Sequence, residues 1–177
     1  GRRLASSTGQ SIQIIDFNED GSVQQITDHP VLNLGSIGSA DWSHDENKIA
    51  VASSYSPNLG GEERYEGIYL VDLQGGDLEL ILGRRFPEGY APTWSPDGRS
   101  IAYTATFGHS LGIYVHNLEE QVVRFIARGT YNAWSPDGSK LAVCCEDGLK
   151  LVDFDGQNER VLSEAVRGDT HPLSWSR

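Results

Sequence analysis

A segment that begins with tryptophan and serine recurs along this chain, and it constrains the possible fold more than any other feature. Its copies read DWSHDENKIAV at 41–51, TWSPDGRSIAY at 93–103, AWSPDGSKLAV at 133–143 and SWSR at 174–177. The tryptophans are Trp42, Trp94, Trp134 and Trp175, so their spacings are 52, 40 and 41 residues. A period of about 40 residues is typical of propellers whose blades each contain four strands.

Two short segments follow each full copy in the same order. The first reads IYLVDL at 68–73, IYVHNL at 113–118 and LKLVDF at 149–154, and the second reads LELIL at 78–82, VVRFIA at 122–127 and RVLS at 160–163. These runs are rich in β-branched and aromatic residues and are bounded by Gly, Asp and Asn, which indicates strands. No segment keeps a helical period. Each repeat is therefore predicted to be an antiparallel sheet of four strands, called a to d in chain order.

The predicted connection between strands a and b has the composition of a tight turn. Proline presets φ, aspartate bonds its own backbone, and glycine accepts a positive φ. The turn residues of the two regular copies are Asp97, Gly98, Asp137 and Gly138. The first copy has no glycine there, and we expect Asn47 to supply the permissive backbone position. The recurring tryptophans are expected to pack between adjacent sheets.

The predicted fold class is all-β, a propeller of four-stranded antiparallel blades with about four blades' worth of sequence, which is either a complete small propeller or a fragment of a larger one. The predicted parts are a linker or processed N-terminus at 1–10 and a β-propeller domain at 11–177, which contains a half blade of strands c and d at 11–27, full blades at 40–83, 92–127 and 132–163, and the start of a further strand at 173–177. Strand b of the half blade is expected to be missing.

The run W-S-P-D-G, followed by an apolar strand and then by I-Y-V or L-K-L-V-D, resembles the WD-like propeller repeats of the TolB family. It occurs at 94–98 with 113–115 and at 134–138 with 149–153, and the resemblance extends from about Ile12 onward. It implies a non-catalytic scaffold that binds a protein or peptide partner, and it favours a periplasmic or extracellular location.

Similar repeats also form the propellers of prolyl-oligopeptidase-like and tricorn-like peptidases. The alternative function is therefore the gating or accessory portion of such a peptidase. In that case a catalytic domain, or further blades of the propeller, would lie outside this chain.

Composition argues against several classes of partner. The formal net charge of −11 disfavours nucleic acid, because binding a phosphate backbone requires clustered Lys and Arg. No apolar run approaches the roughly 20 residues that cross a bilayer, so membrane insertion is not expected.

Cys144 and Cys145 are adjacent, and neighbouring side chains of a strand point to opposite faces, so we expect buried free thiols and no disulfide. No cofactor and no metal site are predicted.

The sequence GHSLG at 108–112 matches the G-x-S-x-G nucleophile elbow of lipases and esterases. That elbow needs a strand before the serine and a helix after it, and the residues after Ser110 have a strand pattern instead. The match is interpreted as chance, and the chain is predicted not to be an enzyme.

Asp153, Asp155 and Asn158 resemble part of a calcium loop, but too few ligands are present, so a hairpin turn is predicted there.

One face of the predicted propeller carries all of the irregular connections. In an up-and-down blade the b–c and d–a loops emerge together, and loops on a rigid scaffold are the usual place for recognition. Arginine and tyrosine are the residues that most often anchor protein interfaces. The candidate binding residues on this face are Arg84, Arg85, Tyr90, His109, Arg128, Tyr131, Arg167 and His171. The alternative is that the arginines only solvate the surface and pair with nearby carboxylates such as Glu88 and Asp169.

Overall fold

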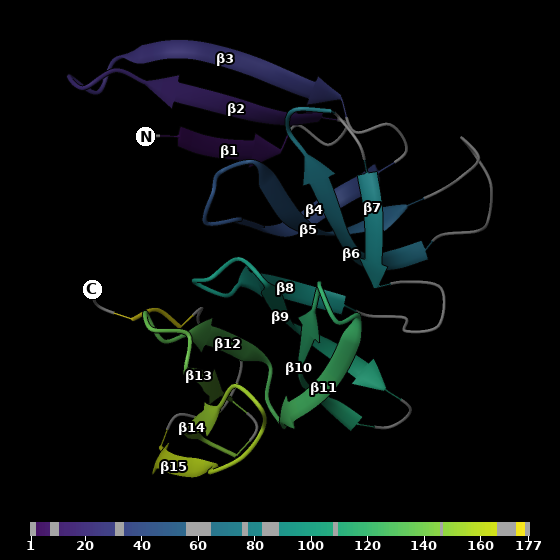
Figure 1. Cartoon of the computed structure of the whole chain (residues 1–177), viewed down its shortest axis with the longest axis vertical. Coiled ribbons are helices and arrows are strands. Elements are labelled where there is room, and N and C mark those ends of the chain that lie inside the picture. The colour runs from purple at the N-terminus through teal and green to yellow at the C-terminus, as the bar shows by residue number, and fades with distance from the viewer. Residues whose placement is uncertain are drawn as a thin grey trace.

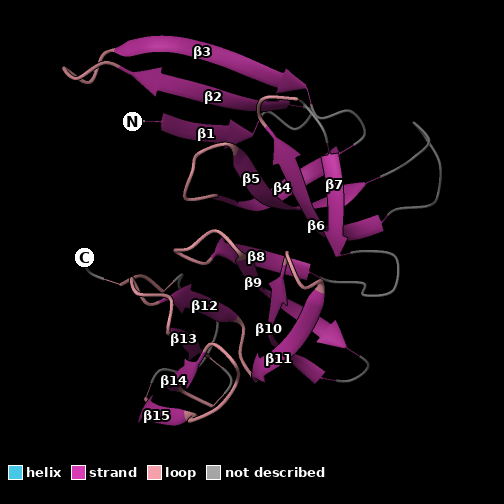
Figure 2. Cartoon of the chain, viewed as in Figure 1, coloured by secondary structure: helices cyan, strands magenta, loops and turns pink. Residues whose placement is uncertain are grey.

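The computed structural model describes residues 3–7, 11–30, 34–55, 65–75, 78–82, 89–107, 110–145, 147–165 and 173–175. The described residues form four antiparallel sheets, which follow one another in chain order from the N-terminal sheet at the top of Figure 1 to the C-terminal sheet at the bottom. Every regular element among them is a strand (Figure 2). Within these ranges no helix is present that could cross a membrane.

The strand bounds follow the predicted a-b-c-d order. The first sheet contains β1 (Arg3–Ser7), β2 (Ser11–Phe17) and β3 (Val23–Pro30). The second contains β4 (Leu34–Trp42), β5 (Lys48–Tyr55), β6 (Tyr65–Asp72) and β7 (Leu78–Leu82). The third contains β8 (Gly89–Trp94), β9 (Ser100–Phe107), β10 (Ser110–Asn117) and β11 (Val122–Ala127). The fourth contains β12 (Tyr131–Trp134), β13 (Lys140–Cys144), β14 (Leu149–Asp153) and β15 (Arg160–Ser163).

The first sheet has one strand more than the sequence pattern indicated. Strand β1 pairs antiparallel with β2, and Arg3 lies opposite Asp16. In the second sheet Lys48, the first residue of strand b, lies opposite Asp72 in the same way. Strand β1 is therefore strand b of the first sheet. The prediction that residues 1–10 are a linker is wrong for residues 3–7, and so is the prediction that strand b is missing.

Strand a of each full blade begins earlier than predicted. It starts at residues 34, 89 and 131, where the sequence pattern placed it at 40, 92 and 132. The pairing of strands a and b shifts register between Leu34 and Ile37 and again between Tyr90 and Thr93, and such irregularities obscure the alternation of side chains. Residues 173–175 do not form the strand that was predicted to start there.

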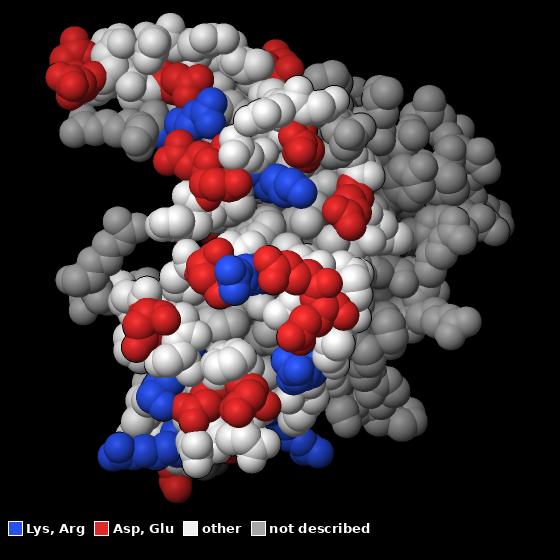
Figure 3. All heavy atoms as spheres, viewed as in Figure 1, with Lys and Arg blue, Asp and Glu red and all other residues white. Residues whose placement is uncertain are grey.

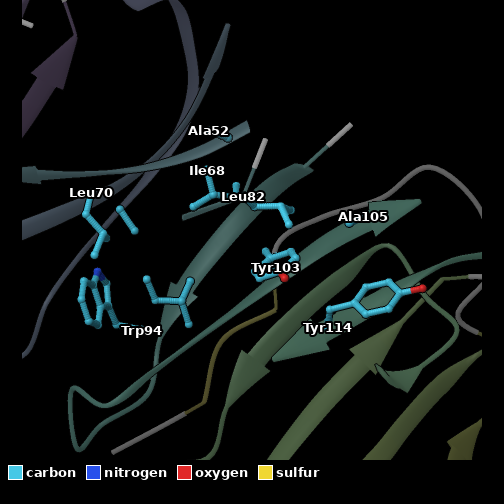
Figure 4. Close-up of a cluster of buried hydrophobic side chains, with 10 residues drawn as sticks. Ala52, Ile68, Leu70, Leu82, Trp94, Tyr103, Ala105 and Tyr114 are labelled. Carbon is cyan, nitrogen blue, oxygen red and sulfur yellow. The ribbon is translucent and has the colours of Figure 1, made fainter. Parts of the chain in front are cut away.

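The hydrophobic core lies between neighbouring sheets. Strand c shows the arrangement most simply, because alternate side chains point to opposite faces. In β6, Ile68 and Leu70 pack toward the third sheet, whereas Tyr69 and Val71 pack toward the first. Figure 4 shows the cluster between the second and third sheets, where Ile68 and Leu70 face Trp94 and Tyr103. Two further clusters join the first sheet to the second and the third to the fourth.

Two of the recurring tryptophans are buried between sheets as expected. Trp94 is 8% exposed and Trp134 is 9% exposed. Trp134 donates its indole N–H to the carbonyl oxygen of Thr93 at 3.2 Å, and Trp175 donates to Ala133 at 3.1 Å. Each bond joins a tryptophan to strand a of the preceding sheet. Trp42 is half-buried and also packs between sheets, against the cluster that joins the first and second, whereas Trp175 is 39% exposed.

The a–b turns share one hydrogen-bonding pattern. In each, a buried serine (Ser43, Ser95 or Ser135) donates its hydroxyl at 2.6 Å to the aspartate two positions later. The same hydroxyl accepts a backbone N–H from the residue that opens strand b. The positive φ falls at Gly98 and Gly138, and in the first copy at Glu46 with a φ of 57°. The prediction that Asn47 takes this conformation is wrong, because Glu46 is the residue that aligns with the two glycines.

Candidate functional site

The predicted binding face lies at the end of the sheets where the b–c and d–a connections emerge. The structure describes three of its candidate residues, Tyr90, Arg128 and Tyr131. The remaining candidates lie outside the described residues: Arg84, Arg85, His109, Arg167 and His171. The prediction that all eight form one surface therefore stays a prediction.

The two described tyrosines belong to strands and not to loops. Tyr90 is the second residue of β8, is half-buried and packs against the cluster between the second and third sheets. Tyr131 is the first residue of β12 and is also half-buried. Arg128 lies in the connection between β11 and β12 and is exposed. Of the three, Arg128 is the side chain most available to a partner.

The connection that carries Arg128 is bonded to strand b of the third sheet and to strand b of the fourth sheet. Thr104 of β9 donates its hydroxyl to the carbonyl oxygen of Thr130 at 2.7 Å, and the N–H of Thr130 donates to the carbonyl oxygen of Cys144 at 2.9 Å. A Cβ atom on Gly129 would lie 2.4 Å from a side-chain carbon of Val143, so only glycine fits there. Arg128 is thus presented on a fixed backbone.

Cys144 and Cys145 form a disulfide at the same end of the fourth sheet, which the sequence reasoning did not expect. Strand β13 ends at Cys144, which lies opposite Tyr131 of β12. Cys145 leaves the extended conformation and has a φ of 100°. The argument from alternating faces holds only inside a strand, and the backbone turn at Cys145 brings the two sulfur atoms together. The prediction of two free thiols is therefore wrong.

Ser110 lies at the first position of β10, opposite Phe107 at the end of β9. Residues 110–117 form a strand, as the sequence indicated, so no helix follows the serine. The strand–turn–helix context of a nucleophile elbow is absent at this position.

The opposite end of the sheets carries the a–b and c–d turns, and acidic side chains gather there. In the view of Figure 3 they form rows across successive sheets, with Lys or Arg beside them. The Ser135 hydroxyl and the bonds from Ser139 lower the pKa of Asp137 to about 2, and Ser43 lowers the pKa of Asp45 in the same way. Backbone N–H groups of Gly75 and Gln74 lower the pKa of Asp72. These carboxylates stay ionised and fix the turns.

The segment that resembles part of a calcium loop is a hairpin turn. The Asp153 carboxylate is bonded by the Lys140 ammonium on one oxygen and by the Asn158 amide at 2.7 Å on the other. Asp155 accepts the backbone N–H of Gln157 at 3.0 Å. Within the described ranges no group of three or more His, Cys, Asp or Glu side chains could hold a metal ion.

Two grooves between neighbouring sheets open on the turn-bearing end, and the sequence reasoning missed both. One, of about 270 Å³, lies between the third and fourth sheets, and the other, of about 260 Å³, lies between the second and third. Trp134 lines the first and Trp94 the second. Each groove combines residues of two blades, so only an alignment of repeat positions across blades could have found it.

Sequential four-stranded antiparallel sheets that bury an aromatic layer between them define a β-propeller built from WD-like blades. No protein-family model matches the chain. The chain is 47% identical over 77 residues to the Tol-Pal system protein TolB of Alcanivorax borkumensis, a match that covers 41% of this chain and 18% of that protein. It also superimposes on the crystal structure of TolB from Acinetobacter baumannii, with a TM-score of 0.61 and 26% identity over 86% of this chain and 37% of that one.

The chain is thus a TolB-like β-propeller, and it spans less than a fifth of the length of that curated relative. A puromycin hydrolase has a similar fold, with a TM-score of 0.64 and 15% identity over 90% of this chain and 28% of that one. At that identity the likeness concerns the fold alone.

Proposed function

We propose that this propeller is a non-catalytic scaffold that binds a protein or peptide partner through the end of its sheets that carries the b–c and d–a connections. The likeness to TolB, which is named as a protein of the Tol-Pal system, supports a partner that is itself a protein. By the same likeness we propose a periplasmic location.

The observation that carries the proposal is the exposed Arg128 on its fixed connection. Ala127 before Arg128 pairs with Ile113 of β10, and Thr130 after it is bonded to β9 and β13, so little conformational entropy remains to be lost when a partner binds. A guanidinium presented in this way offers bidentate bonds to a carboxylate of a partner. Arg84 and Arg85 belong to the d–a connection of the preceding blade, and we propose that they extend the same surface.

The test replaces Arg84, Arg85 and Arg128 together by serine. The immobilised wild-type chain is used to capture its partner from a native extract, and the captured protein is then purified and titrated against both chains. Loss of three interface arginines is expected to weaken binding by roughly 10-fold or more, because buried arginines are frequent hot spots.

The matched control replaces Arg124 and Arg160 by serine, because both lie on outer strands away from the proposed surface. Both variants should keep the β-rich circular dichroism of the wild type. Equal affinity of the triple variant and the wild type would count against the proposal.

Direct hydrolysis is tested separately at Ser110. A fluorophosphonate probe is expected to leave the chain unlabelled, since Ser110 opens a strand and not a helix. Labelling that the Ser110→Ala variant abolishes would instead establish a catalytic serine. An α/β-hydrolase segment encoded after Arg177 would favour the accessory role in a peptidase.

A further inference from the structure

The chain's own Arg3, an exposed residue of the first sheet, bonds to residues of both the first and the second sheet. Its Nε atom lies 2.7 Å from an Asp16 carboxylate oxygen of its own sheet, and its Nη1 atom donates to the carbonyl oxygen of Glu46 at 3.3 Å. The guanidinium carbon lies 5.9 Å from the centre of the Trp42 ring. The two sheets thus hold one cation through a carboxylate, a turn carbonyl and an aromatic face.

Each residue around Arg3 has a counterpart in the later blades. Strand register makes Arg3 equivalent to Lys48 and Ser100, because each lies at the start of strand b. The same register makes Asp16 equivalent to Asn117. The WS-turn pattern makes Trp42 equivalent to Trp94 and Trp134, and Glu46 equivalent to Gly98 and Gly138.

The groove between the third and fourth sheets contains all of these counterparts but lacks the cation. Ser100, Asn117, Trp134 and Gly138 line it together. Ser100 is short and neutral where the first sheet has arginine and the second has lysine. Among the described residues, Arg3 over Trp42 is the one cation stacked on an aromatic ring.

The charge of this groove favours a cation. Asp97, Glu119 and Glu120 line it, against the single cation of Arg99. Arg99 is at the rim, with a side chain that is 64% exposed and a nitrogen 3.7 Å from a Glu119 oxygen. Arg124 lies 3.6 Å from a Glu120 oxygen, so the three carboxylates exceed the two neighbouring cations by one negative charge. One guanidinium from a partner would balance it.

The size of the groove suits one side chain. Its volume of about 270 Å³ is below the roughly 300–1,000 Å³ of pockets that hold drug-sized ligands. Trp134 and the exposed Phe154 supply apolar surface for a methylene stem. The groove between the second and third sheets is a poorer receptor, because Lys48 already lines it.

We propose that the groove lined by Ser100, Asn117, Trp134 and Gly138 binds an arginine side chain of a partner protein, through the same kinds of contact that Arg3 makes between the first and second sheets. The guanidinium stacks on Trp134 and donates to the Gly138 carbonyl and to the acidic rim. This groove is at the opposite end of the sheets from the surface around Arg128. An experiment can therefore contradict one of the two proposals without bearing on the other.

The probe is the peptide acetyl-Gly-Arg-Gly-amide, and its control is the same peptide with citrulline, which keeps the shape and loses the charge. Binding is followed by the indole N–H signal of Trp134 in ¹⁵N-resolved NMR spectra. The arginine peptide is expected to shift this signal in a saturable way, and the citrulline peptide is expected to leave it in place. Equal shifts with both peptides, or none with the arginine peptide, would overturn the proposal.

Two variants are expected to change the affinity of the groove for the arginine peptide in opposite directions. Ser100→Lys supplies the missing cation from the chain itself, as Lys48 and Lys140 do, and is expected to weaken binding at least roughly 10-fold. Asn117→Asp restores the carboxylate found at Asp16 and is expected to strengthen binding roughly 2- to 5-fold. Asn117 accepts N–H groups of its turn with its side-chain oxygen, which an aspartate can also do, as Asp72 does.

The control variant is Gln24→Lys, which adds the same charge on exposed β3 and should change the affinity less than 2-fold by screening arguments. Unchanged affinity in Ser100→Lys would overturn the proposal. A free guanidinium ion that shifts the Trp134 signal at the same concentration as the peptide would show a site for small cations and would overturn the assignment to a partner protein.

Discussion

Trp134 is bonded through its indole N–H to Thr93, whereas the equivalent N–H of Trp94 is buried and has no partner among the described residues. The two tryptophans are otherwise alike, with exposed fractions of 9% and 8%. They occupy the same position in consecutive blades, so this pair separates the contribution of the interblade hydrogen bond from that of the ring.

Replacing each by phenylalanine is therefore informative. Both Trp134→Phe and Trp94→Phe lose part of a buried ring, but only Trp134→Phe also leaves the Thr93 carbonyl without its donor. We expect Trp134→Phe to lower the free energy of unfolding by about 1 kcal/mol more than Trp94→Phe. Urea unfolding followed by circular dichroism measures the difference, and equal losses would show that the bond contributes nothing.

His116 predicts a dependence of stability on pH. It is 6% exposed in strand c of the third sheet, and neither ring nitrogen has a partner among the described residues. Burial lowers the pKa of His116, and the opposing effect of Glu79, the carboxylate that faces it from β7, is smaller. The folded state therefore disfavours the protonated ring.

Because the folded pKa is below the unfolded value of about 6.5, stability should be complete above that pH and should fall as the pH drops below it, by at most about 1.4 kcal/mol per pH unit. The His116→Val variant carries the residue found at Val71 and Val152 and should lose this dependence between pH 7.5 and 5.5. A His116→Val variant with the same slope would contradict this account.

The repeat made the sheets predictable, but it could not reveal contacts that depend on local backbone geometry. Strands c and d were located well because their runs are rich in β-branched and aromatic residues and are bounded by turn residues, as at 122–127. Strand β1 was missed because RLASS has little β-branched or aromatic character, and its pairing with β2 depends on a partner and not on its own pattern.

The two proposed binding sites, the surface around Arg128 and the groove at Trp134, also differ in how far the sequence could predict them. Arg128 could be named from the loop position alone. The groove at Trp134 could not, because its residues come from two blades and its significance depends on what Arg3 does in another blade. The groove arises from the packing of one blade against the next, and no local sequence pattern indicates it.

The disulfide between Cys144 and Cys145 predicts the thiol content of the chain. The intact mass of unreduced protein should be lower than that of the dithiol by two hydrogen atoms, and a thiol reagent should find no free thiol after denaturation. Since the link joins adjacent residues and closes almost no loop, a Cys145→Ser variant should lose only about 1 kcal/mol of stability. Two titratable thiols in the unreduced chain would contradict the assigned bond.

Glu46 predicts a stabilising substitution. Its φ of 57° is in the left-handed region, where a side chain is disfavoured, and glycine occupies the equivalent positions 98 and 138 with φ of 72° and 71°. Glu46→Gly should therefore raise the free energy of unfolding by roughly 0.5–1 kcal/mol. The carbonyl that accepts the Arg3 bond belongs to the backbone and is kept in this variant.

The reverse change at Gly98 supplies the matched control. A Cβ atom there would meet nothing within 4 Å, so Gly98→Ala tests the backbone conformation without a clash. It should destabilise the chain by about 1 kcal/mol, in the direction opposite to that of Glu46→Gly. The urea midpoints of the two variants and the wild type measure both changes in stability. If Glu46→Gly proved less stable than the wild type, the contacts of the Glu46 side chain would have to outweigh its backbone conformation.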